Sequence, residues 1–123
     1  MMDSLKKICI ENNNIRDKGV IALSRVLEEN DTLLTLYLEN NGITAEGAKA
    51  IAKTLKNKVK LSKLNLNYNS IGDEGLKFIS EGIQYNETLR VITLADAGLT
   101  KLHIPQFSKS LSNKRFLTKI LLD

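Results

Sequence analysis

The chain lacks much of what disulfide-stabilised, membrane-bound and many catalytic proteins depend on. Its 123 residues include no tryptophan, one cysteine, one proline and one histidine. A single cysteine cannot close an intrachain disulfide, which excludes a cystine-stapled miniprotein. Aromatic residues make up only 5% of the chain, so the core must be built from aliphatic side chains, chiefly leucine and isoleucine.

No apolar run is long enough to span a membrane, and charges interrupt the N-terminal segment where a signal peptide would need its apolar core. With one cysteine and no export signal, we predict an intracellular, cytoplasmic protein without membrane contact. The formal net charge is +4, and lysine supplies 14 of the 18 basic residues. Because nucleic-acid readers favour arginine, whose planar fork grips phosphate and guanine, we expect no nucleic-acid partner.

The sequence does contain an internal repeat of 28 residues without insertions. Three apolar positions recur in five successive copies, the second lying three residues after the first and the third two residues later. The three sets are Leu5, Leu33, Leu61, Leu89 and Leu117; Ile8, Leu36, Leu64, Ile92 and Ile120; and Ile10, Leu38, Leu66, Leu94 and Leu122. This period predicts one domain of stacked coils, with repeats at 5–32, 33–60, 61–88 and 89–116 and a partial repeat at 117–123.

Each copy begins with alternating apolar and polar residues, which indicates a strand with one buried side. In the second copy we expect Leu36 and Leu38 to point inward, and Thr35, Tyr37 and Glu39 to point outward. An asparagine follows the strand, and its side-chain amide can pair with backbone groups of the neighbouring coils. We therefore predict a structural ladder of amides formed by Asn13, Asn41 and Asn69.

A helical stretch follows in each copy, with apolar residues three and four positions apart. The expected buried stripes are Val20, Leu23, Val26 and Leu27; Ala48, Ile51, Ala52 and Leu55; and Leu76, Ile79 and Ile83. A glycine early in the helix predicts close approach to the adjacent coil, at Gly19, Gly47 and Gly75. Residues suited to capping or to the first helical turn precede these glycines, namely Asp17, Thr44 and Asp73.

At these positions the chain resembles the leucine-rich repeat family, and in particular its ribonuclease-inhibitor-like class, as in the repeats of NOD-like receptors and of Ran GTPase-activating protein. The resemblance extends from Leu5 to Leu122. It implies an α/β leucine-rich repeat solenoid, a right-handed superhelix of four repeats and a fifth strand. The parallel sheet would form the concave face, where partners of this family commonly bind, and the helices would form the convex face.

The fourth copy departs from the others. Ala97 replaces the ladder asparagine, His103 replaces the glycine, and Pro105 follows two residues later. Because proline suits the first turn of a helix, we expect this helix to begin near Pro105, with Phe107 and Leu111 facing inward. Divergence of this kind is typical of a terminal repeat, and a loop adapted to a partner is the alternative.

Neither end of the predicted stack carries a polar capping repeat. Solenoids generally need such caps for solubility, and unpaired terminal strands are templates for pairing with another chain. We therefore expect either a fragment of a longer array or self-association through the uncapped ends.

No motif for catalysis, for a metal or for a cofactor stands out in the sequence. Cys9 and His103 belong to the first and fourth coils, too far apart to act as a pair, and together they cannot complete a tetrahedral zinc site. Glycine-rich phosphate loops and the nucleophile motif of hydrolases are missing. We expect no enzymatic activity and no cofactor.

The outward strand positions form the predicted binding surface for a protein partner. Lysines lie along one edge and acidic residues along the other, so the surface has an electrostatic direction but no single sign, which favours a folded protein. Tyr37 and Tyr68, predicted on adjacent strands, are the hot-spot candidates, unless they only pack against their neighbours. The predicted set is Lys7, Glu11, Tyr37, Glu39, Lys63, Asn65, Tyr68, Thr93 and Asp96.

A basic stripe on the second helix and the chain leaving it is a further candidate, formed by Lys49, Lys53, Lys56 and Lys60. Without arginine or interleaved aromatic residues, we interpret it as a solvated helix face. The predicted function is a non-catalytic protein–protein interaction module. Two alternatives stay open: a GTPase-activating regulator resembling Ran GTPase-activating protein, and a ligand-sensing repeat fragment of a NOD-like receptor.

Overall fold

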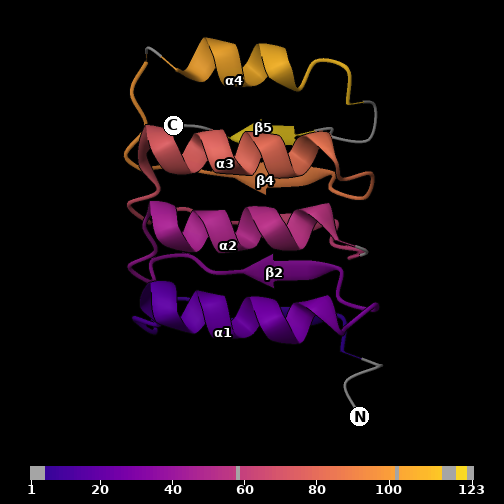
Figure 1. The fold of residues 1–123 in the computed structure, drawn as a ribbon. Helices are drawn as coiled ribbons and strands as arrows, with labels where there is room; N and C mark the ends of the chain where they lie inside the picture. The colour runs from indigo at the N-terminus through magenta and orange to yellow at the C-terminus, as the bar shows by residue number, and fades with distance from the viewer. Residues whose placement is uncertain (1–4, 58, 102, 115–118, 122–123) are drawn as a thin grey trace.

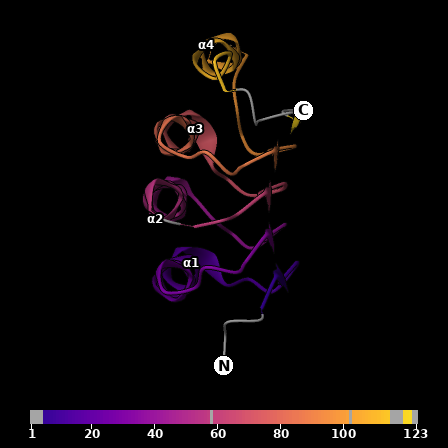
Figure 2. The same cartoon turned by 90° about the vertical axis from the view of Figure 1, so that its right-hand side faces the viewer.

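The computed structural model describes residues 5–57, 59–101, 103–114 and 119–121. Strands and helices alternate along this part of the chain. In order they are β1 (Lys7–Cys9), α1 (Arg16–Glu28), β2 (Thr35–Tyr37), α2 (Ala45–Lys56), β3 (Lys63–Asn65), α3 (Gly72–Gln84), β4 (Val91–Thr93), α4 (Ile104–Ser110) and β5 (Lys119–Leu121). The helices are stacked one above the other (Figure 1), and they form one layer while the strands form a second (Figure 2).

The strands form one sheet in the order β1-β2-β3-β4-β5, and every neighbouring pair is parallel. Residues 28 positions apart lie directly opposite each other, as Ile8 does with Leu36 and Leu36 with Leu64. Each helix carries the chain back to the start of the next strand on the same side of the sheet (Figure 2). The predicted α/β solenoid, with parallel strands in one layer and helices in the other, is confirmed.

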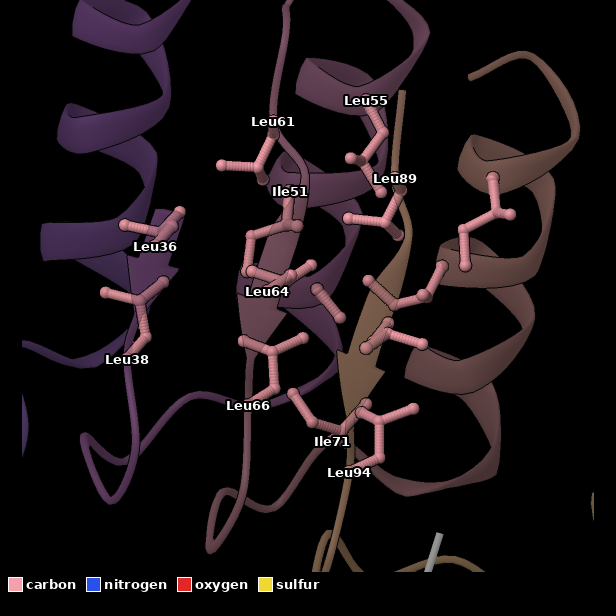
Figure 3. Close-up of a cluster of buried hydrophobic side chains, with 14 of the residues drawn as sticks. Leu36, Leu38, Ile51, Leu55, Leu61, Leu64, Leu66, Ile71, Leu89 and Leu94 are labelled. Carbon is pink, nitrogen blue, oxygen red and sulfur yellow. The ribbon is translucent and has the colours of Figure 1, made fainter. Parts of the chain in front are cut away.

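The core lies between the two layers and is filled by inward side chains of the strands and helices (Figure 3). Leu36, Leu38, Leu64 and Leu66 are at most 1% exposed. The predicted stripes of α2 and α3 are likewise buried, each residue being 4% exposed or less. Full burial of one such side chain contributes about 1.5–3 kcal/mol, so aliphatic packing is the main cohesive force between coils.

The predicted burial is wrong for one residue of the α1 stripe, because Val26 is 44% exposed. The equivalent positions in the next two helices are Thr54 and Gly82, and both are buried. Gly82 faces the preceding helix, since a Cβ added there would lie 2.9 Å from the Cα of Ala52. No helix precedes α1 in the part of the chain that the structure describes, so nothing there covers Val26.

The predicted asparagine ladder has two rungs among the described residues. The Oδ1 atom of Asn41 accepts hydrogen bonds from the backbone N–H groups of Asn13 and Ile15, at 3.0 and 3.3 Å. The Oδ1 atom of Asn69 accepts from Asn41 and Ile43 in the same way, at 2.9 and 3.0 Å. Asn41 and Asn69 are buried, whereas Asn13 is exposed because no described coil lies below it.

The glycines near the helix starts confirm the predicted close approach at two positions. A Cβ at Gly47 would lie 2.5 Å from Oδ1 of Asp17 in the preceding coil, and one at Gly75 would lie 3.1 Å from a side chain of α2. At Gly19 the nearest atoms belong to Ile15 of the same coil, so the expected inter-coil contact is wrong there. The reason is again that α1 begins the described stack.

Two aspartates connect neighbouring coils. Asp17, in the first turn of α1, accepts hydrogen bonds from the N–H groups of Thr44 and Gly47, at 2.8 and 3.0 Å. Asp73, in the first turn of α3, accepts from the N–H and the hydroxyl of Thr100, at 3.0 and 2.7 Å. Thr44 is the N-cap of α2. The predicted capping and first-turn positions are confirmed, and the reach of both carboxylates into the next coil is an additional finding.

The fourth helix begins late, as its proline predicts. α4 starts at Ile104 with Pro105 in its first turn, and Phe107 and Leu111 are each 4% exposed. β5 pairs with β4, but positions 117, 118, 122 and 123 of the predicted partial repeat lie outside the described residues. Within the described part, none of the helices has the length and apolar character needed to cross a bilayer.

Candidate functional site

The strand positions that point away from the core, with the turns that follow them, make up a continuous surface that we call the strand face. Its predicted members occupy three kinds of position. Lys7, Tyr37, Lys63, Asn65 and Thr93 lie in strands, Glu39 is the second residue after β2, and Glu11, Tyr68 and Asp96 lie in turns after β1, β3 and β4. Because the strands pair in register, equivalent residues of successive coils are neighbours across this face.

Contacts between adjacent strands hold two predicted pairs together. The Nζ atom of Lys7 lies 5.3 Å from the ring centroid of Tyr37, within the range of a cation–π interaction. The Nδ2 atom of Asn65 donates to Oε1 of Glu39 at 3.2 Å. The ring of Tyr37 and the carboxylate of Glu39 are therefore positioned by residues of the neighbouring strands.

The turns after the strands impose a left-handed backbone on one equivalent position in each of the first four coils, in addition to other residues with positive φ such as Asn14 and Arg16. Asn12, Asn40, Tyr68 and Asp96 have φ values of 61°, 54°, 57° and 50°. Asparagine and aspartate tolerate this conformation because their short polar side chains can hydrogen-bond locally, whereas tyrosine pays a steric penalty. Tyr68 is also 54% exposed. Its predicted place on a strand is wrong, because β3 ends at Asn65 and the chain turns before Tyr68.

Charge is distributed along the strand direction of this face. Lys7 and Lys63 are the first residues of β1 and β3, and both are exposed. Glu11, Glu39 and Asp96 lie past the other ends of their strands. The strand face thus has a basic edge and an acidic edge.

Thr93 presents its side chain differently from the other predicted members. Its hydroxyl Oγ1 is buried, and no hydrogen-bond partner for it lies among the described residues. Buried hydroxyls are usually paired. The methyl group of Thr93, rather than its hydroxyl, is therefore the part suited to a surface contact.

A cavity of about 780 Å³ that is widely open to the surface adjoins the turns after β3 and β4. Sequence reasoning did not predict it, although the replacement of the ladder asparagine by Ala97 was a signal. It contains two predicted site residues, Tyr68 and Asp96. Its complete lining is Tyr68, Asn69, Ser70, Asp96, Ala97, Gly98, Leu99, Lys101 and Ile104.

On the helical side, Asp73 has a perturbed acidity. The hydrogen bonds from the backbone N–H and the hydroxyl of Thr100 hold the pKa of this carboxyl below its ordinary value of 3.8, and the nearby imidazole of His103 adds a smaller lowering effect. The Nε2 atom of His103 lies 3.9 Å from Oδ2 of Asp73. Cys9 lies on the strand face, in the other layer from these residues.

The lysine stripe differs from the prediction in its aromatic neighbours. Lys49, Lys53 and Lys56 lie on α2 and are exposed, while Lys60 lies in the segment before β3. The Nζ atom of Lys49 lies 5.7 Å from the ring centroid of Phe78, which belongs to α3. The Nζ atom of Lys56 lies 5.6 Å from the ring centroid of Tyr85, the residue that follows α3. The prediction that no aromatic residues lie among these lysines was therefore wrong. The rings come from the next coil and not from the same helix, so the sequence of α2 alone does not show them.

Comparison with known proteins identifies the repeat. The family model described as "Leucine Rich repeat" matches residues 4–24, 29–52 and 57–80, which is more than half of the chain. The chain belongs to the leucine-rich repeat family. Among solved structures, this leucine-rich repeat chain is similar to "Leiomodin-1 Actin-Binding Site 2 (ABS2)", with a TM-score of 0.83 and 24% sequence identity over 97% of this chain and 70% of that chain.

That structural similarity shows the leucine-rich repeat solenoid as the fold. In the comparison with curated proteins, no sequence matches this leucine-rich repeat chain significantly.

Proposed function

We propose that this leucine-rich repeat chain is a single-domain, non-catalytic protein-interaction module whose strand face, the predicted concave face, binds a folded protein. The observation that carries the proposal is the conformation of Tyr68. A left-handed backbone costs a non-glycine residue about 1–2 kcal/mol, and the other three coils use asparagine or aspartate at this position. Tyr68 adds a large exposed ring at an unfavourable backbone position, and such strain is typical of functional sites.

The surroundings of Tyr68 support a binding role. Tyrosine is enriched at binding hot spots because it combines a rigid apolar ring with a polar tip. Tyr37 supplies a second ring on the same face, held by Lys7. The basic and acidic edges would orient a partner that carries the opposite charge arrangement, which a folded protein offers and a uniformly charged polymer does not.

The fold comparison supports a protein as the partner class. The similar leiomodin-1 structure is named as an actin-binding site, so a solenoid of this shape in another protein is associated with binding of a protein. Actin itself is not proposed as the partner of this chain. We also propose the ribonuclease-inhibitor-like class, from the 28-residue coils with one helix each. The single cysteine is the ground for proposing a cytoplasmic location.

The test compares capture by matched tyrosine variants of the full chain. Proteins cross-linked to the wild type are compared with those cross-linked to Tyr68→Asn, which removes the ring but suits the turn. Tyr85→Ala is the control, because Tyr85 is 72% exposed but lies at the end of α3 on the helical side. We expect a partner retained by the wild type and Tyr85→Ala and lost by Tyr68→Asn; equal capture by all three contradicts the proposal.

The GTPase-activating alternative is separated by a turnover assay. Addition of the purified chain to a GTP-loaded Ran-like GTPase is expected to leave the hydrolysis rate unchanged. Accelerated hydrolysis would contradict the proposed non-catalytic module and favour a GTPase-activating regulator instead.

A further inference from the structure

The helix layer has a shallow hollow in its exposed surface, where α1, α2 and α3 lie side by side (Figure 1). The hollow measures about 470 Å³ and is open to the surface. Most of its lining comes from α2, with one residue from α1 and two from α3. We call it the helix-side hollow. It belongs to the opposite layer from the strand face, so it is a separate surface.

Three lysines of the basic stripe line this hollow. Lys49, Lys53 and Lys56 follow one another at intervals of four and three residues along α2, and all three are exposed. Among the described residues, none of them forms an ion pair with a carboxylate. The row is about 10.5 Å long from its first to its last residue, at 1.5 Å per residue of helix. Cations placed in this way favour a ligand that carries several carboxylates.

The hollow also offers apolar surface beside the lysines. Ile21 of α1, Ala50 of α2 and Phe78 of α3 line it and are partly exposed. The Nζ atom of Lys49 lies 5.7 Å from the ring centroid of Phe78, so a cation and an aromatic ring occupy the same place. A ligand with an apolar side chain as well as carboxylates would remove this surface from water. A solvated helix face, which the sequence of α2 alone indicates, would need no such lining.

Two acidic residues restrict the class of anionic partner. Glu46 and Glu81 line the same hollow and are exposed. They would repel a nucleic-acid strand or an anionic bilayer, because both present phosphates without gaps. A bilayer surface is also too flat to fill a hollow. A peptide segment can place carboxylates opposite the lysines and neutral residues opposite the glutamates, so a protein partner fits best.

The dimensions of an extended peptide match the lysine row. Residues i, i+2 and i+4 of an extended chain point to the same side, and the first and last lie about 13 Å apart. The distance of about 10.5 Å between Lys49 and Lys56 along the helix is slightly shorter, and the flexible lysine stems can cover the difference. Two acidic residues with an apolar residue midway between them would therefore reach both ends of the row and the apolar lining.

We propose that the helix-side hollow binds an acidic segment of a protein partner, in which an apolar residue lies between glutamates or aspartates. Lys49, Lys53 and Lys56 bind the carboxylates, and Ile21 and Phe78 contact the apolar side chain. The inference goes beyond the proposed function and does not rest on it, because the two surfaces share no residue.

The test is an NMR titration of the ¹⁵N-labelled full chain with three capped peptides at low ionic strength. All have glycine-serine flanks; their centres are Glu-Glu-Leu-Glu-Glu, the same sequence with glutamine for every glutamate, and the same sequence with serine for leucine. We expect the acidic leucine peptide to shift the amide signals of Lys49, Lys53 and Phe78 saturably and to leave those of the strand face unchanged. The glutamine peptide should bind about tenfold more weakly, and the serine peptide about threefold more weakly.

Matched double variants separate the hollow from the overall charge. Lys49→Gln/Lys53→Gln and Lys18→Gln/Lys109→Gln lower the net charge equally, but the second pair is exposed outside the hollow. We expect the first to weaken binding of the acidic leucine peptide about fivefold, and the second to change it by less than about twofold. Phe78→Ala should weaken binding of the leucine peptide but not of the serine peptide. If this variant does not fold, the leucine and serine peptides still measure the apolar contribution on the wild type.

Four results with the peptides would overturn the proposal. They are equal affinities for the glutamate and glutamine peptides, equal affinities for the leucine and serine peptides, equal weakening by the two double variants, and no saturable shift with any peptide. A short oligouridylate and vesicles containing phosphatidylserine test the other anionic partners. Tighter binding of either probe than of the acidic leucine peptide, lost in Lys49→Gln/Lys53→Gln, would replace the peptide site by a nucleic-acid or a membrane site.

Discussion

At the scale of single residues, the turn after each strand distinguishes tolerated from strained side chains. The left-handed position is filled by Asn12, Asn40 and Asp96 in three coils and by Tyr68 in the remaining one. The Nδ2 atom of Asn40 donates to Oδ1 of Asn12 at 2.7 Å, so these asparagines also connect adjacent turns. Tyr68 cannot form that contact and keeps its ring largely in solvent.

Replacing Tyr68 by asparagine should stabilise the fold. Because asparagine tolerates the required φ of 57°, we expect Tyr68→Asn to raise the free energy of unfolding by about 0.5–1 kcal/mol. The midpoint of urea denaturation measures the change. Asp96→Tyr, at the same position of the next coil, should shift the midpoint in the opposite direction. A loss of stability in Tyr68→Asn would mean that the ring is retained for packing and would count against its binding role.

At the scale of elements, neighbouring coils are joined by more than apolar packing. The carboxylate of Asp17 accepts a hydrogen bond from the backbone N–H of Thr44, and that of Asp73 accepts one from the backbone N–H of Thr100. In both cases the threonine lies 27 residues further along the chain, in the next coil. The helices α2 and α3 approach so closely that Gly82 has no room for a side chain. The carboxylate contacts should respond to pH, and the close helix packing should respond to an added side chain.

The contact between Asp73 and Thr100 should make stability dependent on acid. Since the pKa of Asp73 is lowered in the folded state, its carboxylate favours folding at pH above 3.8, and this contribution is lost as the pH falls through the lowered folded value. Thr100→Val removes the hydroxyl donor and should move the pKa of Asp73 back toward 3.8. A ¹³C NMR titration of the Asp73 carboxyl in both proteins measures the shift; identical titration curves would contradict this account.

The helix contact predicts that alanine at position 82 is harmful even though alanine favours helices. Relative to glycine, alanine gains about 1 kcal/mol of helix propensity. A Cβ at Gly82, however, would lie 2.8 Å from the carbonyl oxygen of Ala52, which forces α2 and α3 apart. We expect Gly82→Ala to destabilise the fold by about 1–3 kcal/mol in thermal or urea unfolding. The exposed neighbour variant Glu81→Ala should be nearly neutral, and a stabilised Gly82→Ala protein would refute the tight contact.

Several elements were predictable because their signal lies within one coil. The alternation around Leu36 and the proline at position 105 specify local geometry, and both interpretations are confirmed. The errors concern relations between coils. Val26 has the spacing of a buried residue, but burial requires a preceding helix, and the rings near Lys49 and Lys56 come from another coil. The strain at Tyr68 depends on a backbone angle, and the cavity beside Ala97 is lined by the turns of two different coils; no local pattern reports either feature.

At the scale of the whole molecule, cohesion is uneven along the stack. α2 and α3 pack against helices on both sides, as Figure 1 shows. α4 has seven residues and a helix neighbour only at α3 among the described elements. In solenoids each repeat is stabilised by its immediate neighbours, so stability should decrease toward such a coil.

Hydrogen exchange should follow this gradient. We expect the backbone amides of α4 to exchange faster than those of α2 and α3, because α4 can open without disturbing the central coils. Exchange measured by mass spectrometry or NMR under native conditions tests the order. Equal protection of α3 and α4 would show that the stack opens only as one cooperative unit.

The uniform register of the sheet makes each coil an interchangeable building block. Because Ile8, Leu36 and Leu64 meet in the same alignment, duplication or deletion of one 28-residue segment would leave the partners on both sides matched. Each such event would extend or shorten the array by one strand spacing, about 4.8 Å, and no loop would need redesign. Unequal recombination within the gene therefore offers a direct route to family members of graded length.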